Sequence, residues 1–296
     1  MIKRVMGLLA ALVAVVATVV ILPATTASAA GCAAAWNSSS VYTGGGAASY
    51  NGHNWTARWW TQNEKPGSSE VWADQGSCGS GTDPGGPGSS TGFVVSEAQF
   101  NQMFPGRSSF YTYSGLTAAL SAYPGFANTG SDTVKKQEAA AFLANVSHET
   151  GGLVYVVEQN TANYPHYCDT SQSYGCPAGQ SAYYGRGPIQ LSWNFNYKTA
   201  GDALGINLLA NPYLVEQDAS VAWKTGLWYW NTQNGPGTMT AHSAMVNGAG
   251  FGETIRSING SLECNGGNPA QVQSRIDKYQ AFVQILGTTP GTHLSC

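Results

Sequence analysis

The sequence predicts two folded domains of different class, a small all-β domain followed by a larger, mainly helical one. Residues 30–78 carry turn signals and many tryptophans but no apolar run long enough for a helix. Residues 79–92 contain no large apolar side chain, which is typical of a flexible linker. Residues 93–296 place apolar side chains at helical spacing. A chain of 296 residues is long enough for this division.

The composition excludes some classes of function. Charged residues make up only 10% of the chain, and the formal net charge is −3. Proteins that bind nucleic acid need clustered Lys and Arg, so we expect no nucleic-acid partner. Aromatic residues reach 11%, which supplies enough surface for a folded core and argues against a disordered chain.

Residues 1–29 have the pattern of a secretory signal peptide. Lys3 and Arg4 precede eighteen uncharged residues, and a small-residue triplet ends at Ala29. A membrane anchor is the alternative, because eighteen apolar residues approach the length that spans a bilayer. We expect cleavage after Ala29, which predicts an extracellular protein without membrane contact after cleavage.

The six cysteines of a secreted chain are expected to form disulfides. Their order along the chain suggests the three local pairs Cys32–Cys78, Cys168–Cys176 and Cys264–Cys296, the last tying the final helix to the loop before it. Six cysteines allow fifteen connectivities, so this pairing stays a hypothesis. A zinc site is the competing interpretation, but no two cysteines have C-x2-C spacing and the five histidines are scattered. We therefore expect no metal.

The first domain holds five of the nine tryptophans. Trp59 and Trp60 are adjacent, and neighbours in an extended strand point to opposite faces, so at least one should be exposed in so thin a domain. Exposed indole rings can stack on sugar rings, whereas a core role is the alternative that we expect for Trp36, Trp55 or Trp72. The run from Tyr50 to Gln62 resembles the small chitin-binding modules of bacterial chitinases. This resemblance implies a surface that binds insoluble chitin.

The second domain begins with a capping box, Ser96 with Gln99, which predicts a first helix. A longer helix is predicted between the start signal Ser131-Asp132 and the stop signal Gly151-Gly152, with an apolar stripe at i, i+3, i+4 and i+7 from Ala139 to Val146. Glu149 continues this stripe. Burial and the helix C-terminus both favour its protonated form, which a general acid requires.

Glu158 follows nine residues later and supplies a second carboxylate that could flank the same bond. Ordinary surface ion pairs are the alternative for both glutamates. The run from His148 to Gly152 lacks the second histidine of a zinc protease H-E-x-x-H motif. Together with the run from Gly185 to Tyr197, it strongly resembles the family 19 chitinases, plant-type enzymes that also occur in actinobacteria. The similarity extends from about Val94 to Cys296.

This resemblance implies a mainly α, two-lobed, lysozyme-like catalytic domain that needs no cofactor. It implies Glu149 as general acid, Glu158 as general base and Ser192 as a residue that helps to hold the attacking water. The residues that it assigns to sugar binding are Gln190, Asn196, Asn259 and His148. Without the family, Ser192 and the amides could simply be loop-capping groups.

The last predicted helix has an apolar seam that includes Val272, Ile276 and Tyr279, and Arg275 is expected to point inward with it. A buried guanidinium needs a carboxylate, and the sequence offers Glu263, in the loop before the helix, or Glu158. The resemblance implies a Glu and an Arg twelve residues apart in a charge network that supports the base. A plain structural ion pair is the equal alternative for Glu263 and Arg275.

These observations together predict a secreted, monomeric endochitinase whose partners are chitin and chitin oligosaccharides. Inversion of configuration is implied by the family, with the two carboxyl groups about 6.5–9.5 Å apart. A peptidoglycan-lytic muramidase and a non-catalytic chitin-binding protein are the alternatives. The acidic chain is a poor match for an anionic bacterial wall, and the presence of both glutamates argues against a dead enzyme. Nutrition and antifungal attack are both compatible with this activity.

Overall fold

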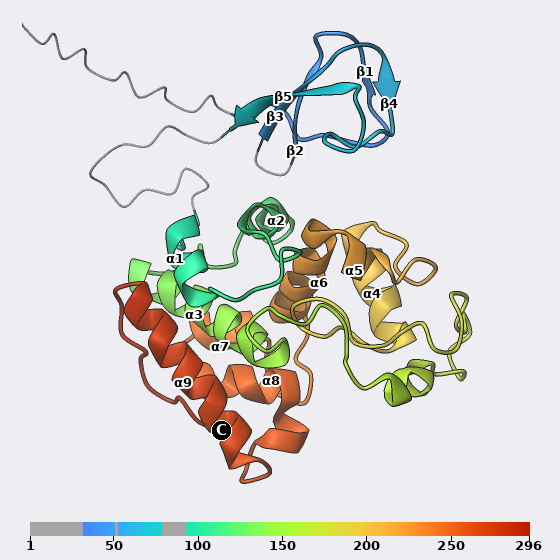
Figure 1. The fold of residues 1–296 in the computed structure, drawn as a ribbon. Coiled ribbons are helices and arrows are strands. Elements are labelled where there is room, and N and C mark those ends of the chain that lie inside the picture. The colour runs from blue at the N-terminus through green and yellow to red at the C-terminus, as the bar shows by residue number, and fades with distance from the viewer. Residues whose placement is uncertain (1–31, 51–52, 79–92) are drawn as a thin grey trace, which may run out of the picture.

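The computed structural model of the chain describes residues 32–50, 53–78 and 93–296. The expected signal peptide, residues 1–29, and the expected linker, residues 79–92, lie outside the described residues. The described part contains strands in its N-terminal unit and helices in its C-terminal unit, as predicted (Figure 1). Within those ranges, no helix is both long and apolar enough to cross a bilayer.

The N-terminal unit is built from two small antiparallel sheets. One sheet has the order β2-β3-β5 and the other pairs β1 with β4. Its core contains Ala48, Ala57, Val71 and Trp72, with Trp36 and Trp55 packed against them. A disulfide joins Cys32 to Cys78 and closes the unit. The strands are β1 Val41–Tyr42, β2 Ala47–Tyr50, β3 His53–Ala57, β4 Thr61–Gln62 and β5 Trp72–Ser77.

The C-terminal unit is helical throughout its core. The helices are α1 Glu97–Met103, α2 Tyr113–Ala119, the 3-10 helix η1 Leu120–Ala122, α3 Asp132–Glu149, the 3-10 helix η2 Thr161–Tyr167, α4 Asn194–Leu204, α5 Leu214–Gln217, α6 Ala219–Thr232, α7 Ala241–Val246, α8 Phe251–Glu263 and α9 Pro269–Ile285.

Helix α3 forms the centre of this unit. Ser131 caps its first turn by accepting a hydrogen bond from the Val134 amide, and the helix ends at Glu149, as the start and stop signals predicted. All residues from Glu138 to Ser147 are buried, so the predicted apolar stripe was too narrow. The small alanine side chains let neighbouring helices approach α3 from several sides, and α9 packs along it (Figure 1).

Two hydrophobic cores give the unit its two lobes. Helix α6 joins them, because Trp223 and Trp230 lie in the first core and Trp228 lies in the second. An apolar helix of this kind can be buried on most of its circumference. The fold is therefore the mainly helical, two-lobed domain that was expected.

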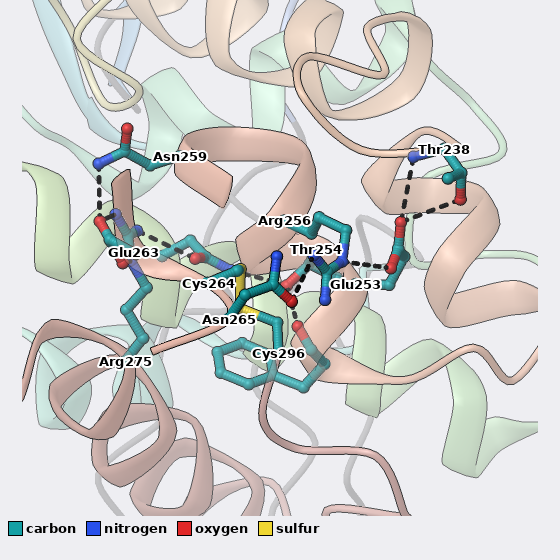
Figure 2. Close-up of a disulfide and its surroundings, with 12 residues drawn as sticks. Thr238, Glu253, Thr254, Arg256, Asn259, Glu263, Cys264, Asn265, Arg275 and Cys296 are labelled. Carbon is teal, nitrogen blue, oxygen red and sulfur yellow. Dashed lines mark hydrogen bonds and ion pairs between the residues drawn. A yellow bond between two sulfur atoms is a disulfide. The ribbon is translucent and has the colours of Figure 1, made fainter. Parts of the chain in front are cut away.

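The two remaining disulfides pair Cys168 with Cys176 and Cys264 with Cys296. The position of the second one corrects the prediction in one respect. Cys264 directly follows α8 and Cys296 ends the C-terminal tail, so this disulfide joins α8 to the tail (Figure 2). The final helix α9 ends eleven residues before Cys296 and takes no direct part.

Candidate active site

Glu149 is the last residue of α3, and its side chain is 19% exposed. One carboxylate oxygen accepts a hydrogen bond of 2.5 Å from Nη2 of Arg275. His148 points elsewhere, since successive helical residues are about 100° apart. Its Nδ1 lies 3.2 Å from the Ser274 hydroxyl on α9, and burial and the Arg275 charge lower the pKa of this imidazole. His148 therefore packs against α9 and is not among the side chains that line the cleft described below.

Arg275 is buried between two carboxylates. Its Nε and Nη2 donate to Glu263 at 2.8 and 2.7 Å, and Nη1 donates to the Asn145 side-chain oxygen at 3.1 Å. Burial by itself raises the pKa of Glu263, but the hydrogen bonds and charge of Arg275 outweigh it and lower that pKa. Of the two partners that the sequence offered, the structure selects Glu263.

Three details of this cluster differ from the expectations. Glu263 ends α8 and is not in the following loop. Among the described residues, the carboxylates that Arg275 contacts are Glu263 and Glu149 and not Glu158, so the network adjoins the expected acid instead of the expected base. Asn259 also donates to Glu263, at 2.8 Å, and Figure 2 shows Asn259 and Arg275 reaching the same carboxylate.

Glu158 is held by donors from its own side of the lobe. One carboxylate oxygen accepts hydrogen bonds from the Asn163 amide at 2.7 Å and the Tyr167 hydroxyl at 3.0 Å, and the other faces the Gly185 amide at 3.4 Å. The backbone amide of Glu158 donates to the Gly185 carbonyl at 2.9 Å. Burial, followed by the hydrogen bond to Glu158, raises the pKa of Tyr167 to about 12. These donors fix the direction of the Glu158 carboxylate.

A cleft of about 360 Å³ brings most of the predicted site together. Glu149 lines it, and Tyr167 links its wall to Glu158. The four predicted polar residues are also present. The lining residues are Glu149, Tyr167, Ile189, Gln190, Leu191, Ser192, Asn196, Tyr229, Ile258 and Asn259.

The turn that supplies Gln190 and Ser192 has an unusual backbone. Gln190 has a φ of 52° and Trp193 a φ of 75°, and residues other than Gly rarely adopt this region of backbone conformation. Such strain persists where surrounding contacts impose it, and it is concentrated at functional sites. The side-chain amide of Gln190 donates to the Gly187 carbonyl, and the side-chain amide of Asn196 donates to the Ser192 carbonyl. The loop-capping role considered for the amides is therefore real, and both residues still face the cleft.

The two tryptophans proposed for binding lie on the surface of the N-terminal unit. Trp59 is 54% and Trp60 is 60% exposed, so both, and not merely one, face solvent. They occupy the bend between β3 and β4, so the strand geometry assumed from the sequence does not apply. Trp72 is buried, and Trp36 and Trp55 are partly buried, as the core interpretation predicted.

Sequence reasoning missed two tyrosines and one buried carboxylate. Tyr229 lines the cleft, and burial followed by the nearby Glu149 charge raises its pKa. Tyr229 lies among the aromatic residues of α6, and their sequence pattern does not show which of them faces the cleft and which lies in the core. The signal for Tyr167 was its place among polar residues soon after Glu158. Glu138 had no signal at all, because its side-chain donors Trp230 and His242 are about a hundred residues away and its third donor is the backbone amide of Ala127.

Two family models match the chain in separate regions. Residues 94–296 match the family described as Chitinase class I, and residues 35–73 match carbohydrate-binding module family 5/12. Endochitinase A of Zea mays is 49% identical over 188 residues, which are 63% of this chain and 63% of that protein. The chain thus spans less than two thirds of the length of this relative.

Solved structures agree with the family matches. The structure of chitinase C from Streptomyces griseus HUT6037 is similar with a TM-score of 0.69 and 78% identity, covering 90% of this chain and 100% of that chain. A family GH19, class IV chitinase from Zea mays is similar with a TM-score of 0.61 and 46% identity, covering 69% of this chain and 98% of that chain. The chain therefore belongs to the class I chitinase family, GH19, and carries an N-terminal carbohydrate-binding module.

Proposed function

We propose that the protein is an endochitinase that hydrolyses β-1,4 bonds between N-acetylglucosamine units of chitin with inversion of configuration. The observation that carries the proposal is the cleft in which Glu149 meets Gln190, Ser192, Asn196 and Asn259. This lining combines one carboxyl group with neutral hydroxyl and amide groups. Neutral polar groups suit an uncharged sugar chain, because they hydrogen-bond its hydroxyl and acetamido groups without requiring a counter-charge.

In the proposed reaction, Glu149 protonates the glycosidic oxygen and Glu158 removes a proton from the attacking water. Ser192 helps to hold that water. Asn163 and Tyr167 support the role of Glu158, because their hydrogen bonds orient the carboxylate. Arg275 donates to Glu149 at 2.5 Å, so its charge would stabilise the carboxylate left after proton transfer. The same proposal includes sugar-binding roles for Gln190, Asn196, Asn259 and His148. The His148 side chain would have to move away from α9 to reach the sugar.

The N-terminal module would keep the enzyme on its insoluble substrate through Trp59 and Trp60, whose exposed rings can stack on sugar faces. The N-terminal sequence pattern supports secretion, and the likeness to the Streptomyces enzyme supports an actinobacterial source. A monomer is part of the same proposal. Attack on fungal walls and use of chitin as a nutrient both require this activity.

The test compares the wild-type chain, Glu149→Gln and Glu158→Gln on colloidal chitin and on purified peptidoglycan. Glu97→Gln is the matched control, because Glu97 is exposed on α1. We expect wild type and control to release oligosaccharides from chitin only, initially as the α-anomer by NMR, and each site variant to lose at least about a hundredfold in rate. Clearing of peptidoglycan alone would instead indicate a muramidase, chitin binding without release a lectin-like protein, and an initial β-anomer a retaining mechanism.

A further inference from the structure

The backbone of Arg186 connects the two segments that carry the proposed base and the proposed water-binding residue. It forms one antiparallel bridge with Val157, directly before Glu158, and another with Leu191, directly before Ser192. The Arg186 amide donates to the Leu191 carbonyl at 3.1 Å, and the Leu191 amide donates back at 2.9 Å. A displacement of Arg186 would therefore move both segments.

The side chain of Arg186 is completely buried and tightly oriented. Its Nε pairs with Glu216 at 2.7 Å. Its Nη1 donates to the Ala182 carbonyl at 2.7 Å and to the Tyr197 hydroxyl at 2.8 Å. A guanidinium donates hydrogen bonds in several fixed directions within one plane, which the single ammonium of lysine cannot do.

An aromatic stack links this guanidinium to the proposed base. The Arg186 guanidinium carbon lies 3.5 Å from the centre of the Tyr184 ring. The Tyr184 ring stacks on Tyr164, with ring centres 3.7 Å apart and planes 10° from parallel. The Tyr164 hydroxyl then donates to the backbone carbonyl of Glu158 at 2.9 Å. The fixed plane of the guanidinium thus restrains Glu158 through two tyrosines as well as through the backbone.

We propose that Arg186 is a positioning residue that holds Glu158 in the orientation needed to activate water. The inference rests on the proposed function and deepens it. Arg186 does not line the cleft, so it acts through Tyr184, Tyr164 and the backbone bridges and makes no contact with substrate. A misplacement of about 1 Å can cost about a hundredfold in rate, so loss of this restraint should affect the chemical step more than binding.

The test uses Arg186→Lys in the full chain, assayed on a soluble N-acetylglucosamine hexamer. Arg107→Lys is the matched control, because Arg107 also lies over an aromatic ring and donates to backbone carbonyls, but it lies between α1 and α2 and does not line the cleft. We expect kcat of Arg186→Lys to fall at least about tenfold with KM changed less than about threefold. Arg107→Lys should keep both constants within about twofold of wild type.

A second pair of variants decides the matter if Arg186→Lys does not fold. Tyr164→Leu removes the stack and the bond to Glu158, whereas Tyr174→Leu removes a partly buried tyrosine of the same lobe that contacts neither. Only Tyr164→Leu should lower kcat at constant KM, and Tyr164→Phe, which keeps the ring, should recover part of the loss. Unchanged kcat in folded Arg186→Lys, or in Tyr164→Leu, would overturn the inference. A fully active Glu158→Gln would instead refute the proposed base.

Discussion

Replacing Glu263 by Gln tests the buried charge cluster beside the cleft. Glu263 is 1% exposed and accepts two hydrogen bonds from Arg275 and one from Asn259. Glutamine keeps the size and one acceptor oxygen, but it removes the negative charge and turns an NH₂ group toward existing donors. Arg275 then keeps Glu149 as its only carboxylate partner in the described structure.

The expected loss follows from that geometry. Breaking a buried ion pair by changing one partner costs about 3–5 kcal/mol, because the other charge stays buried without compensation. Glu149 remains within 2.5 Å of Arg275, so we expect the lower end, about 3 kcal/mol at pH 7. For a domain of this size, a loss of about 3 kcal/mol in the free energy of unfolding corresponds to a fall in Tm of about 6–12 °C.

The difference should depend on pH in a direction that the pKa fixes. The folded pKa of Glu263 lies below its ordinary value of 4.5. Its charge therefore stabilises the fold above about pH 4.5, and this contribution is lost as the pH falls through the folded pKa. Protonated Glu263 resembles glutamine, so the Tm gap between wild type and Glu263→Gln should close on acidification.

Calorimetry of both proteins from pH 7 to pH 3 measures this gap, with exposed Glu97→Gln as the control that should shift Tm by less than about 2 °C. A gap that stays constant over this range would show that the charge of Glu263 is not what stabilises the cluster. A gap at pH 7 below about 1 kcal/mol would refute the buried-pair estimate.

Three further outcomes are expected. Trp59→Ala and Trp60→Ala should each weaken binding to insoluble chitin about 2–10-fold in a pull-down assay without lowering Tm, and unchanged binding would remove the tryptophans from the proposed surface. His242→Gln should lower the free energy of unfolding by about 1.5–3 kcal/mol at pH 5–6 and by little at pH 9. The hydrogen bond to Glu138 raises the pKa of His242, so the stability that His242 contributes is lost as the pH rises through that pKa. A loss of stability that does not depend on pH would contradict this. Gly187→Ala should cost about 1–2 kcal/mol in thermal unfolding, because φ is +71° and a neighbouring valine lies 3.1 Å from the added carbon, and a neutral effect would contradict this.

Local signals in the sequence predicted the elements that depend on local interactions. The Ser96–Gln99 capping box and the Ser131 cap were both correct, because a cap is a bond between residues three apart. The prediction that Arg275 points inward was also correct, since helical periodicity determines which residues lie on the same face of a helix. The predicted stripe on α3 is buried as expected, but it covers only part of the buried surface of that helix. Periodicity reports one packed face, and only the tertiary structure shows that α3 is covered on several sides.

Partners distant in sequence could not be predicted in the same way. Arg275 lies 126 residues from Glu149, and no property of either residue in the sequence indicates that they touch. The missed contacts of Glu138 show the same limit, since its two side-chain donors, Trp230 and His242, come from α6 and α7. In the sequence, a glutamate that is buried in a helix interior cannot be distinguished from an exposed one until its neighbours in the fold are known. The cleft residues were found because motif resemblance carried information that spacing alone lacks.

Sharing Arg275 between two glutamates has a consequence for the proposed acid. Arg275 and Glu263 carry opposite charges, so this buried pair is neutral as a unit. After Glu149 gives its proton to the leaving oxygen, the new carboxylate already has Arg275 at 2.5 Å and needs no reorganisation. If Glu263 were absent, the guanidinium of Arg275 would stay buried with less compensation of its charge, which is costly in the interior of a protein. Glu263 thus balances the Arg275 charge that, in the proposed reaction, would stabilise the product of proton transfer.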